Sequence, residues 1–158
     1  MRPRCRGDIF VSDGESTNTR VVKFSADGKL IKFWGTKGTG PGQFDVPHAI
    51  AIDSQARIYV ADRSNKRIQV FNADGGQLGV MTNVGTPFGL CITKDDLLYT
   101  VDGTEHVDDC RVFDLKDNQR EIAHFSGLTG PHMLAVDAQG AIYFAETRGN
   151  DVRKYVRK

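Results

Sequence analysis

Two proline-histidine pairs occupy equivalent places in two similar segments of the sequence. The segment "DVPHAIAID" contains His48, and "TGPHMLAVD" contains His132. A third segment between them, "GTPFGLCIT", has Phe88 at the same place. Imidazole is a common zinc ligand, so two histidines in alternate copies of a repeat form a candidate metal site. The simpler alternative is that each histidine is only a turn residue ahead of an inner strand.

A second group of potential ligands lies in the segment "GTEHVDDC". It contains Glu105, His106, Asp108 and Asp109, which could bind a divalent cation through oxygen ligands. A solvated turn is the favoured interpretation, because the spacing is not that of an EF-hand. His124 is expected in an outer strand without a chemical role. The sequence has no nucleophile elbow, P-loop or dinucleotide fingerprint, which argues against serine-hydrolase and phosphate chemistry.

The composition is that of an ordinary globular protein. Twenty-one basic and 20 acidic side chains leave a formal charge of +1, so no overall field attracts nucleic acid or an acidic membrane. The apolar runs are far shorter than the roughly 20 residues that span a bilayer. The start "MRPRCRGDIF" lacks the apolar region of a signal peptide. Cys5, Cys91 and Cys110 form no C-x-x-C pair, which argues against a zinc finger or a disulfide scaffold. Neither nucleic acid nor membrane is expected as a partner, and the compartment stays open.

A repeat of roughly 40 to 50 residues runs through the chain. Acidic residues end one predicted strand of each copy: Asp13, Asp62, Asp102 and Glu146. Prolines precede another strand: Pro47, Pro87 and Pro131. Arginines open a third recurring run: Arg20, Arg67 and Arg111. The prolines are 40 residues apart (47 to 87) and then 44 (87 to 131), and the other markers keep similar spacings. The arginines are expected to pair with the acidic strand ends.

Each copy contains short β-branched and aromatic runs separated by turn signals such as "SADGK" and "NADGG". The copy that starts at Pro47 has predicted strands at 49–53, 57–62, 67–72 and 77–83. The next copy has predicted strands near 88–93, 97–102, 111–115 and 120–125. Four-stranded antiparallel repeats of this length predict an all-β protein with the architecture of a β-propeller.

The first and last copies are expected to be incomplete. The first begins at "GDIFVSD", a second strand, and the last stops at "VRKYVRK", a third strand. Strand numbers of three, four, four and three predict about three and a half blades. We therefore expect residues 1–158 to form one partial propeller domain, as in the C-terminal part of a longer ring. The expected blades are about 7–40, 41–84, 85–127 and 128–158. Their open edges predict self-association or marginal stability.

The string "GQFDVPHAIAIDSQARIYVADRSNKRIQVFNADG" resembles the NHL repeat. The longer stretch that begins "DIFVSDGESTNTRVVKF" is similar to the peptidyl-α-hydroxyglycine α-amidating lyases, and the likeness runs from about Gly7 to Lys158. That family implies a six-bladed propeller that cleaves peptides ending in α-hydroxyglycine into a peptide amide and glyoxylate, at a zinc held by three histidines. His48 and His132 match two of these ligands, and the third would lie upstream of Met1.

The ring geometry accounts for histidine in every second copy. Alternate blades of a six-bladed ring stand about 120° apart, so three such histidines converge on one point and leave zinc an open position for substrate. The meander places His48 and the residues after Asp62 on the same rim. Arg63 on that rim matches the arginine that orients the family's substrate, and its planar charged fork suits a carboxylate or a polarised hydroxyl.

Two positions differ from the lyase pattern. After "SDG" the family has a catalytic tyrosine, whereas this chain has Glu15 followed by Ser16. An acidic residue commonly follows the last zinc histidine and helps to bind a structural calcium ion, whereas Met133 stands here. The resemblance therefore implies zinc, while the proton-transfer step and the calcium site lack their usual residues.

Two functions from different classes follow. One is a lyase in which zinc acts as a Lewis acid and Arg63 positions the peptide substrate. The other is a non-catalytic NHL scaffold that presents its loop face to a protein or peptide. Glu15 in place of tyrosine favours the scaffold, and the likeness along most of the chain favours the lyase. The physiological peptide stays open.

Overall fold

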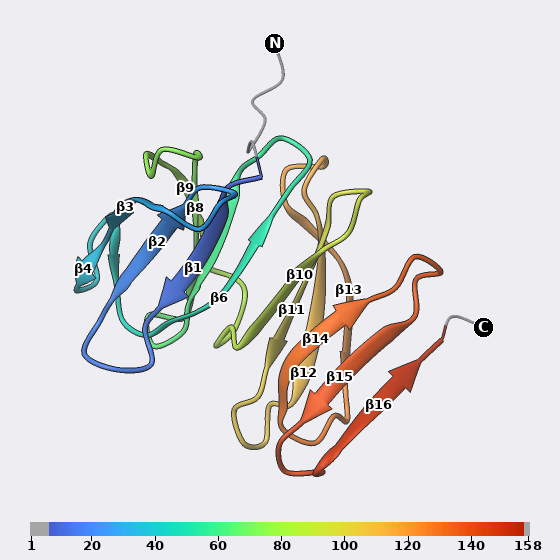
Figure 1. Ribbon diagram of the computed structural model, residues 1–158. Helices are drawn as coiled ribbons and strands as arrows, with labels where there is room; N and C mark the ends of the chain where they lie inside the picture. Colours follow the sequence, from blue (N-terminus) through green and yellow to red (C-terminus); the bar gives the residue numbers. More distant parts are fainter. Residues whose placement is uncertain (1–6, 157–158) are drawn as a thin grey trace.

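The computed structural model describes residues 7–156, and this part of the chain consists of β-strands and loops (Figure 1). Blade 1 contains β1 (Ile9–Asp13), β2 (Arg20–Phe24) and β3 (Leu30–Trp34). Blade 2 contains β6 (Pro47–Ile52), β7 (Ile58–Asp62), β8 (Arg67–Phe71) and β9 (Gln77–Met81). Blade 3 contains β10 (Gly89–Ile92), β11 (Leu97–Asp102), β12 (Asp109–Asp114) and β13 (Arg120–Ser126). Blade 4 contains β14 (Pro131–Val136), β15 (Ile142–Glu146) and β16 (Asp151–Tyr155).

Each blade is a simple antiparallel meander, with consecutive strands paired in chain order. The blades follow one another from blue to red in Figure 1, and β6, β10 and β14 contact each other in turn as the inner strands. This arrangement confirms the all-β propeller class. The numbers of strands in the four blades, three, four, four and three, also agree with the sequence pattern.

One further pair of strands was not expected. β4 (Thr36–Lys37) and β5 (Gln43–Phe44) pair in parallel within the glycine-rich loop between blades 1 and 2. The guanidinium of Arg67 donates hydrogen bonds to the carbonyls of Thr39, Gly40 and Gln43, which holds the loop in a compact form. The loop sequence carries no strand signal of its own. Its shape depends on the side chain of Arg67, which comes from β8.

The core lies between the blades. Phe10 of blade 1 packs in one cluster with Ile58 and Phe71 of blade 2. A second cluster joins blades 2 and 3, and a third joins blades 3 and 4. Each large apolar side chain buried in this way contributes roughly 1.5–3 kcal/mol. Strand β7 is buried on both faces along its whole length, which explains why "IYVAD" is a continuous rather than an alternating apolar run.

The recurring arginines pair with acidic residues, with one difference from expectation. Arg20 and Arg67 bind the aspartates that end the preceding strands, at 2.8 Å (Nε to Asp13 Oδ2) and 2.7 Å (Nε to Asp62 Oδ2). Arg111 instead binds Asp109 in its own strand, at 3.2 Å. In blades 1 and 2 the arginine stands directly opposite the acidic strand end, whereas in blade 3 Asp109 holds that place opposite Asp102, two residues before Arg111.

The two cysteines in the described residues are free thiols. Cys110 is fully buried, and this burial raises its pKa to about 12, with the carboxylate of Asp109 adding to the shift. Cys91 is partly buried, and Cys5 lies outside the described residues. Nothing in residues 7–156 forms a helix of the length and apolar character needed to cross a bilayer.

Candidate functional site

The candidate site lies on the rim where the inner strands begin, the lower rim in Figure 1. β6 starts with Pro47 and His48, and β14 starts with Pro131 and His132. The backbone N–H of Arg63 donates to the Val46 carbonyl, so the chain leaving β7 is tied to the chain entering β6. Arg63 therefore lies on the same rim as His48, as the meander predicts.

The structure brings His48 and His132 together. Their ring centroids lie 4.7 Å apart, with an interplanar angle of 68°. Phe88, at the same place in the intervening blade, packs against both imidazoles, with centroid distances of 5.6 Å to His48 and 5.4 Å to His132. The three proline-linked positions thus form one cluster, with two imidazoles and an apolar wall.

His48 is held in a defined orientation. Its Nδ1 lies 2.6 Å from the Phe88 carbonyl oxygen, and because a carbonyl only accepts, Nδ1 carries the proton. In the neutral ring the lone pair is then on Nε2, which is the arrangement seen in metal-binding histidines. Burial lowers the pKa of His48, as do the nearby Arg63 and His132, while the Phe88 hydrogen bond and Glu15 oppose the shift. The imidazole is therefore biased toward its neutral, ligand-competent form.

Arg63 lies over the face of Phe88, with its guanidinium carbon 5.0 Å from the ring centroid. Its Nη1 lies 3.2 Å from Glu15 Oε1. The same Glu15 oxygen lies 3.2 Å from His48 Nε2. Arg63 therefore belongs to the cluster, and a carboxylate already contacts both its guanidinium and the histidine.

Glu15 is the site residue that sequence reasoning missed. In the sequence, Glu15 differs from the tyrosine of the lyase pattern, and that difference assigns no role to its carboxylate. The sequence feature that could have identified Glu15 is its place directly after Gly14, where the chain leaves β1 on the same rim as His48. The structure shows that this loop of blade 1 reaches over blade 2.

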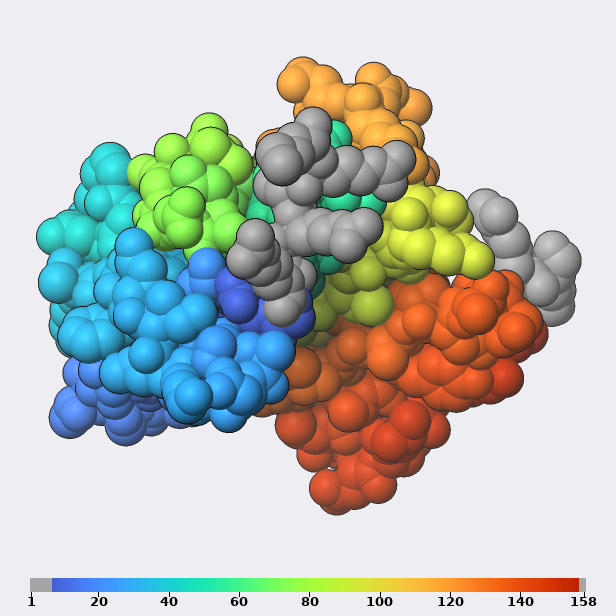
Figure 2. Space-filling view, turned by 45° about the horizontal axis from the view of Figure 1, so that its top comes forward, coloured from blue at the N-terminus to red at the C-terminus, as the bar shows by residue number. Residues whose placement is uncertain are grey.

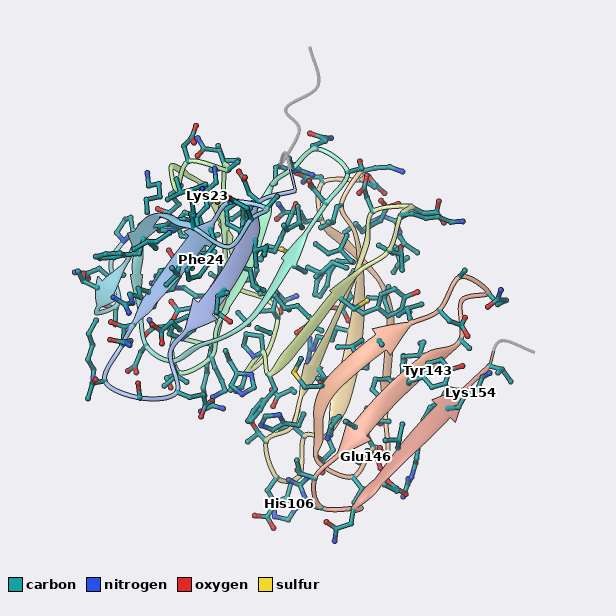
Figure 3. All side chains as sticks on the ribbon, in the orientation of Figure 1. Lys23, Phe24, His106, Tyr143, Glu146 and Lys154 are labelled. Atoms are coloured by element: carbon teal, nitrogen blue, oxygen red, sulfur yellow. The ribbon has the colours of Figure 1, made fainter. Side chains whose placement is uncertain are left out.

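The acidic loop between β11 and β12 does not form a ligand cluster. Asp108 pairs with Arg148, and Asp109 binds His124 at 2.7 Å (Oδ2 to Nε2), while Glu105 is exposed beside His106 (Figure 3). The solvated-turn interpretation is thus correct for Glu105 and His106 and wrong for Asp109, which is buried at the start of β12. Over residues 7–156, no group of three or more His, Cys, Asp and Glu side chains is arranged to hold a metal ion.

Glycines let the blades approach at this rim. A Cβ on Gly14 would lie 2.4 Å from the Pro47 carbonyl oxygen, and a Cβ on Gly103 would lie 2.4 Å from the Pro131 carbonyl oxygen. In each case the glycine follows the acidic end of one strand and packs on the proline of the next blade. The close approach therefore positions the histidine that follows the proline.

We expect Gly14→Ala to lower the free energy of unfolding by about 1–3 kcal/mol, because the added methyl must displace the Pro47 backbone. Gly79→Ala is the matched control, since a Cβ there meets no atom within 4 Å. Urea denaturation of both variants measures the difference. Equal stability of the two would contradict the role of this close contact.

Comparisons with known proteins agree with the architecture. A family model described as a 6-bladed beta-propeller matches residues 5–130. NHL repeat-containing protein 3 of Homo sapiens is 34% identical, over 95% of this chain and 47% of its own length. Peptidyl-alpha-hydroxyglycine alpha-amidating lyase 1 of Drosophila melanogaster is 29% identical, over 96% of this chain and 33% of its own length. A solved structure of U3-55K shares the fold, with a TM-score of 0.75 and 19% identity over 94% of this chain and 45% of its own. The chain spans about half the length of the first relative and a third of the second.

Proposed function

Because the chain belongs to the 6-bladed β-propeller family, we propose that this rim is part of a peptidyl-α-hydroxyglycine lyase centre, with His48 and His132 as zinc ligands and Arg63 as the substrate-positioning residue. The observation that carries the proposal is the 4.7 Å approach of the two imidazoles beside the Arg63 guanidinium. The relation to the Drosophila lyase over nearly the whole chain supports the same chemistry.

The donor set is compatible with zinc but supplies two of the three protein ligands that a catalytic site of this kind needs. The Nδ1 proton of His48 is held by the Phe88 carbonyl, so Nε2 is the nitrogen that would bind zinc, in place of the Glu15 carboxylate oxygen that lies 3.2 Å from it. The third ligand would come from outside the described residues. When bound, zinc would act as a Lewis acid toward the substrate hydroxyl. The calcium site stays a prediction, and Met133 offers it no carboxylate.

The residues of the chain itself perform binding and orientation. Arg63 carries a permanent charge and a planar set of donors, which can hold the substrate carboxylate at the rim. Its contact with Phe88 limits the directions in which the guanidinium can point. Phe88 also packs against both imidazoles and keeps water from their inner faces. Together these groups would fix the end of a peptide next to the histidine pair.

We expect His48→Ala and His132→Ala each to weaken zinc binding by the chain about tenfold or more, because either change removes one of two imidazole donors. His106→Ala is the control, since the His106 side chain is 91% exposed on another loop. Zinc titration followed by calorimetry measures the affinity, and glyoxylate release from an α-hydroxyglycine peptide measures activity. Unchanged zinc affinity in both site variants would overturn the metal assignment.

A non-catalytic scaffold is the second candidate. It is favoured by Glu15 at the place of the catalytic tyrosine and by the 34% identity to human NHL repeat-containing protein 3. In that case the same rim would bind a peptide or protein without cleaving it. Peptide binding without glyoxylate release, at saturating zinc, would support this candidate over the lyase.

A further inference from the structure

Glu15 enters the candidate site from a different blade. It lies in the loop between β1 and β2, and its side chain is 68% exposed. Its Oε1 nevertheless lies 3.2 Å from both Arg63 Nη1 and His48 Nε2. Gly14, immediately before it, packs against Pro47 and fixes the backbone from which this side chain reaches. The carboxylate thus lies over the site without being buried in it.

Glu15 contacts the guanidinium that is proposed to receive the substrate carboxylate. Both the Glu15 side chain and the end of a peptide present a planar carboxylate, and Arg63 offers one guanidinium to receive it. An internal group held by a short loop acts at a high effective concentration. A free carboxylate would therefore compete with Glu15 for Arg63 Nη1.

We infer that Glu15 is an internal competitor that determines which ligands the site accepts, an inference that rests on the proposed function. Arg63 is available only in the fraction of molecules in which Glu15 has moved away, so the apparent affinity for a carboxylate is reduced by that fraction. Ligands that make further contacts with the rim overcome this reduction. Small carboxylates that contact Arg63 alone do not.

The test compares an acid with its amide. The probes are N-acetyl-phenylalanyl-glycine and the same peptide with a C-terminal amide, and calorimetry measures their binding to the full chain. Glu15→Gln keeps the shape of the side chain and removes its charge. Glu105→Gln is the control, since the Glu105 side chain is 75% exposed on another loop. Circular dichroism checks that all variants are folded.

Glu15→Gln is expected to bind the acid about fivefold more tightly than the unmodified chain does, with no change in its affinity for the amide. Glu105→Gln is expected to bind both peptides with the affinities of the unmodified chain. Equal affinities of Glu15→Gln and the unmodified chain for the acid would overturn the competitor role of Glu15. That result would not contradict carboxylate binding by Arg63. Weaker binding by Glu15→Gln would overturn it too, because Glu15 would then assist the ligand. If neither protein distinguishes the acid from the amide, the proposed substrate-positioning role of Arg63 fails instead.

Discussion

Asp62→Ala is expected to lower the free energy of unfolding by about 3–5 kcal/mol, measured by urea denaturation. Asp62 is fully buried and accepts hydrogen bonds from the Asp45 backbone N–H and from the side chains of Asn65, Arg67 and Gln69. Alanine would leave the Arg67 guanidinium, itself largely buried, without its carboxylate partner. Removing one member of a buried ion pair is far more costly than removing an exposed one.

The effect should extend to the candidate site. The hydrogen bond from Asp45 to Asp62 holds the chain that enters β6 just before His48, and Arg63 follows Asp62 directly. Asp117→Ala is the matched control, because Asp117 forms an exposed pair with Arg120. Such pairs are worth about 0–1 kcal/mol. A loss for Asp62→Ala no larger than that of the control would show that the buried network does not stabilise the blade.

The second large effect concerns association between copies of the chain. Ile9 and Val11 of β1 are 48% and 41% exposed, whereas Ile58 and Val60, at the same places in β7, are 0% exposed beneath blade 1. The outward face of blade 1 therefore has the apolar pattern of a face that another blade covers. Figure 2 shows blade 1 in blue and blade 4 in red on opposite sides of the molecule.

Blade 4 offers a complementary surface in a second copy. Cross-strand pairing places Met133, Ala145 and Val152 in one row, and Met133 and Val152 are 43% and 70% exposed. We predict that blade 1 of one copy packs on blade 4 of another, as successive blades pack within the chain. Sedimentation velocity over a concentration range of about a hundredfold should show a shift from monomer to oligomer.

Val11→Lys should abolish this shift, because a charge would be buried between the blades. Leu78→Lys is the control, since Leu78 is also exposed but lies on the outer strand β9 of an internal blade. Association that persists in Val11→Lys, or a monomer at every concentration of the unmodified chain, would contradict the prediction.

The sequence by itself determined the repeat, the order of strands and the rim on which the candidate site lies. Strand runs such as "RIYVAD" and turns such as "NADGG" are local signals, so each strand with its turn could be predicted from a window of about ten residues. The recurrence of Pro47 and Pro131 then indicated that His48 and His132 hold equivalent places in alternate blades. A meander alone suffices to place Arg63 on their rim.

Only the tertiary structure decided what these side chains contact. The carbonyl that orients His48 belongs to Phe88 of the next blade, and the carboxylate that reaches Arg63 belongs to Glu15 of the preceding one. Arg111 likewise pairs with Asp109, because Asp109 and not the arginine stands opposite Asp102 in the strand register of blade 3. Local propensity sets the strands, whereas contacts between blades depend on how closely the packed sheets approach and on where each loop ends, and no short stretch of sequence encodes these distances.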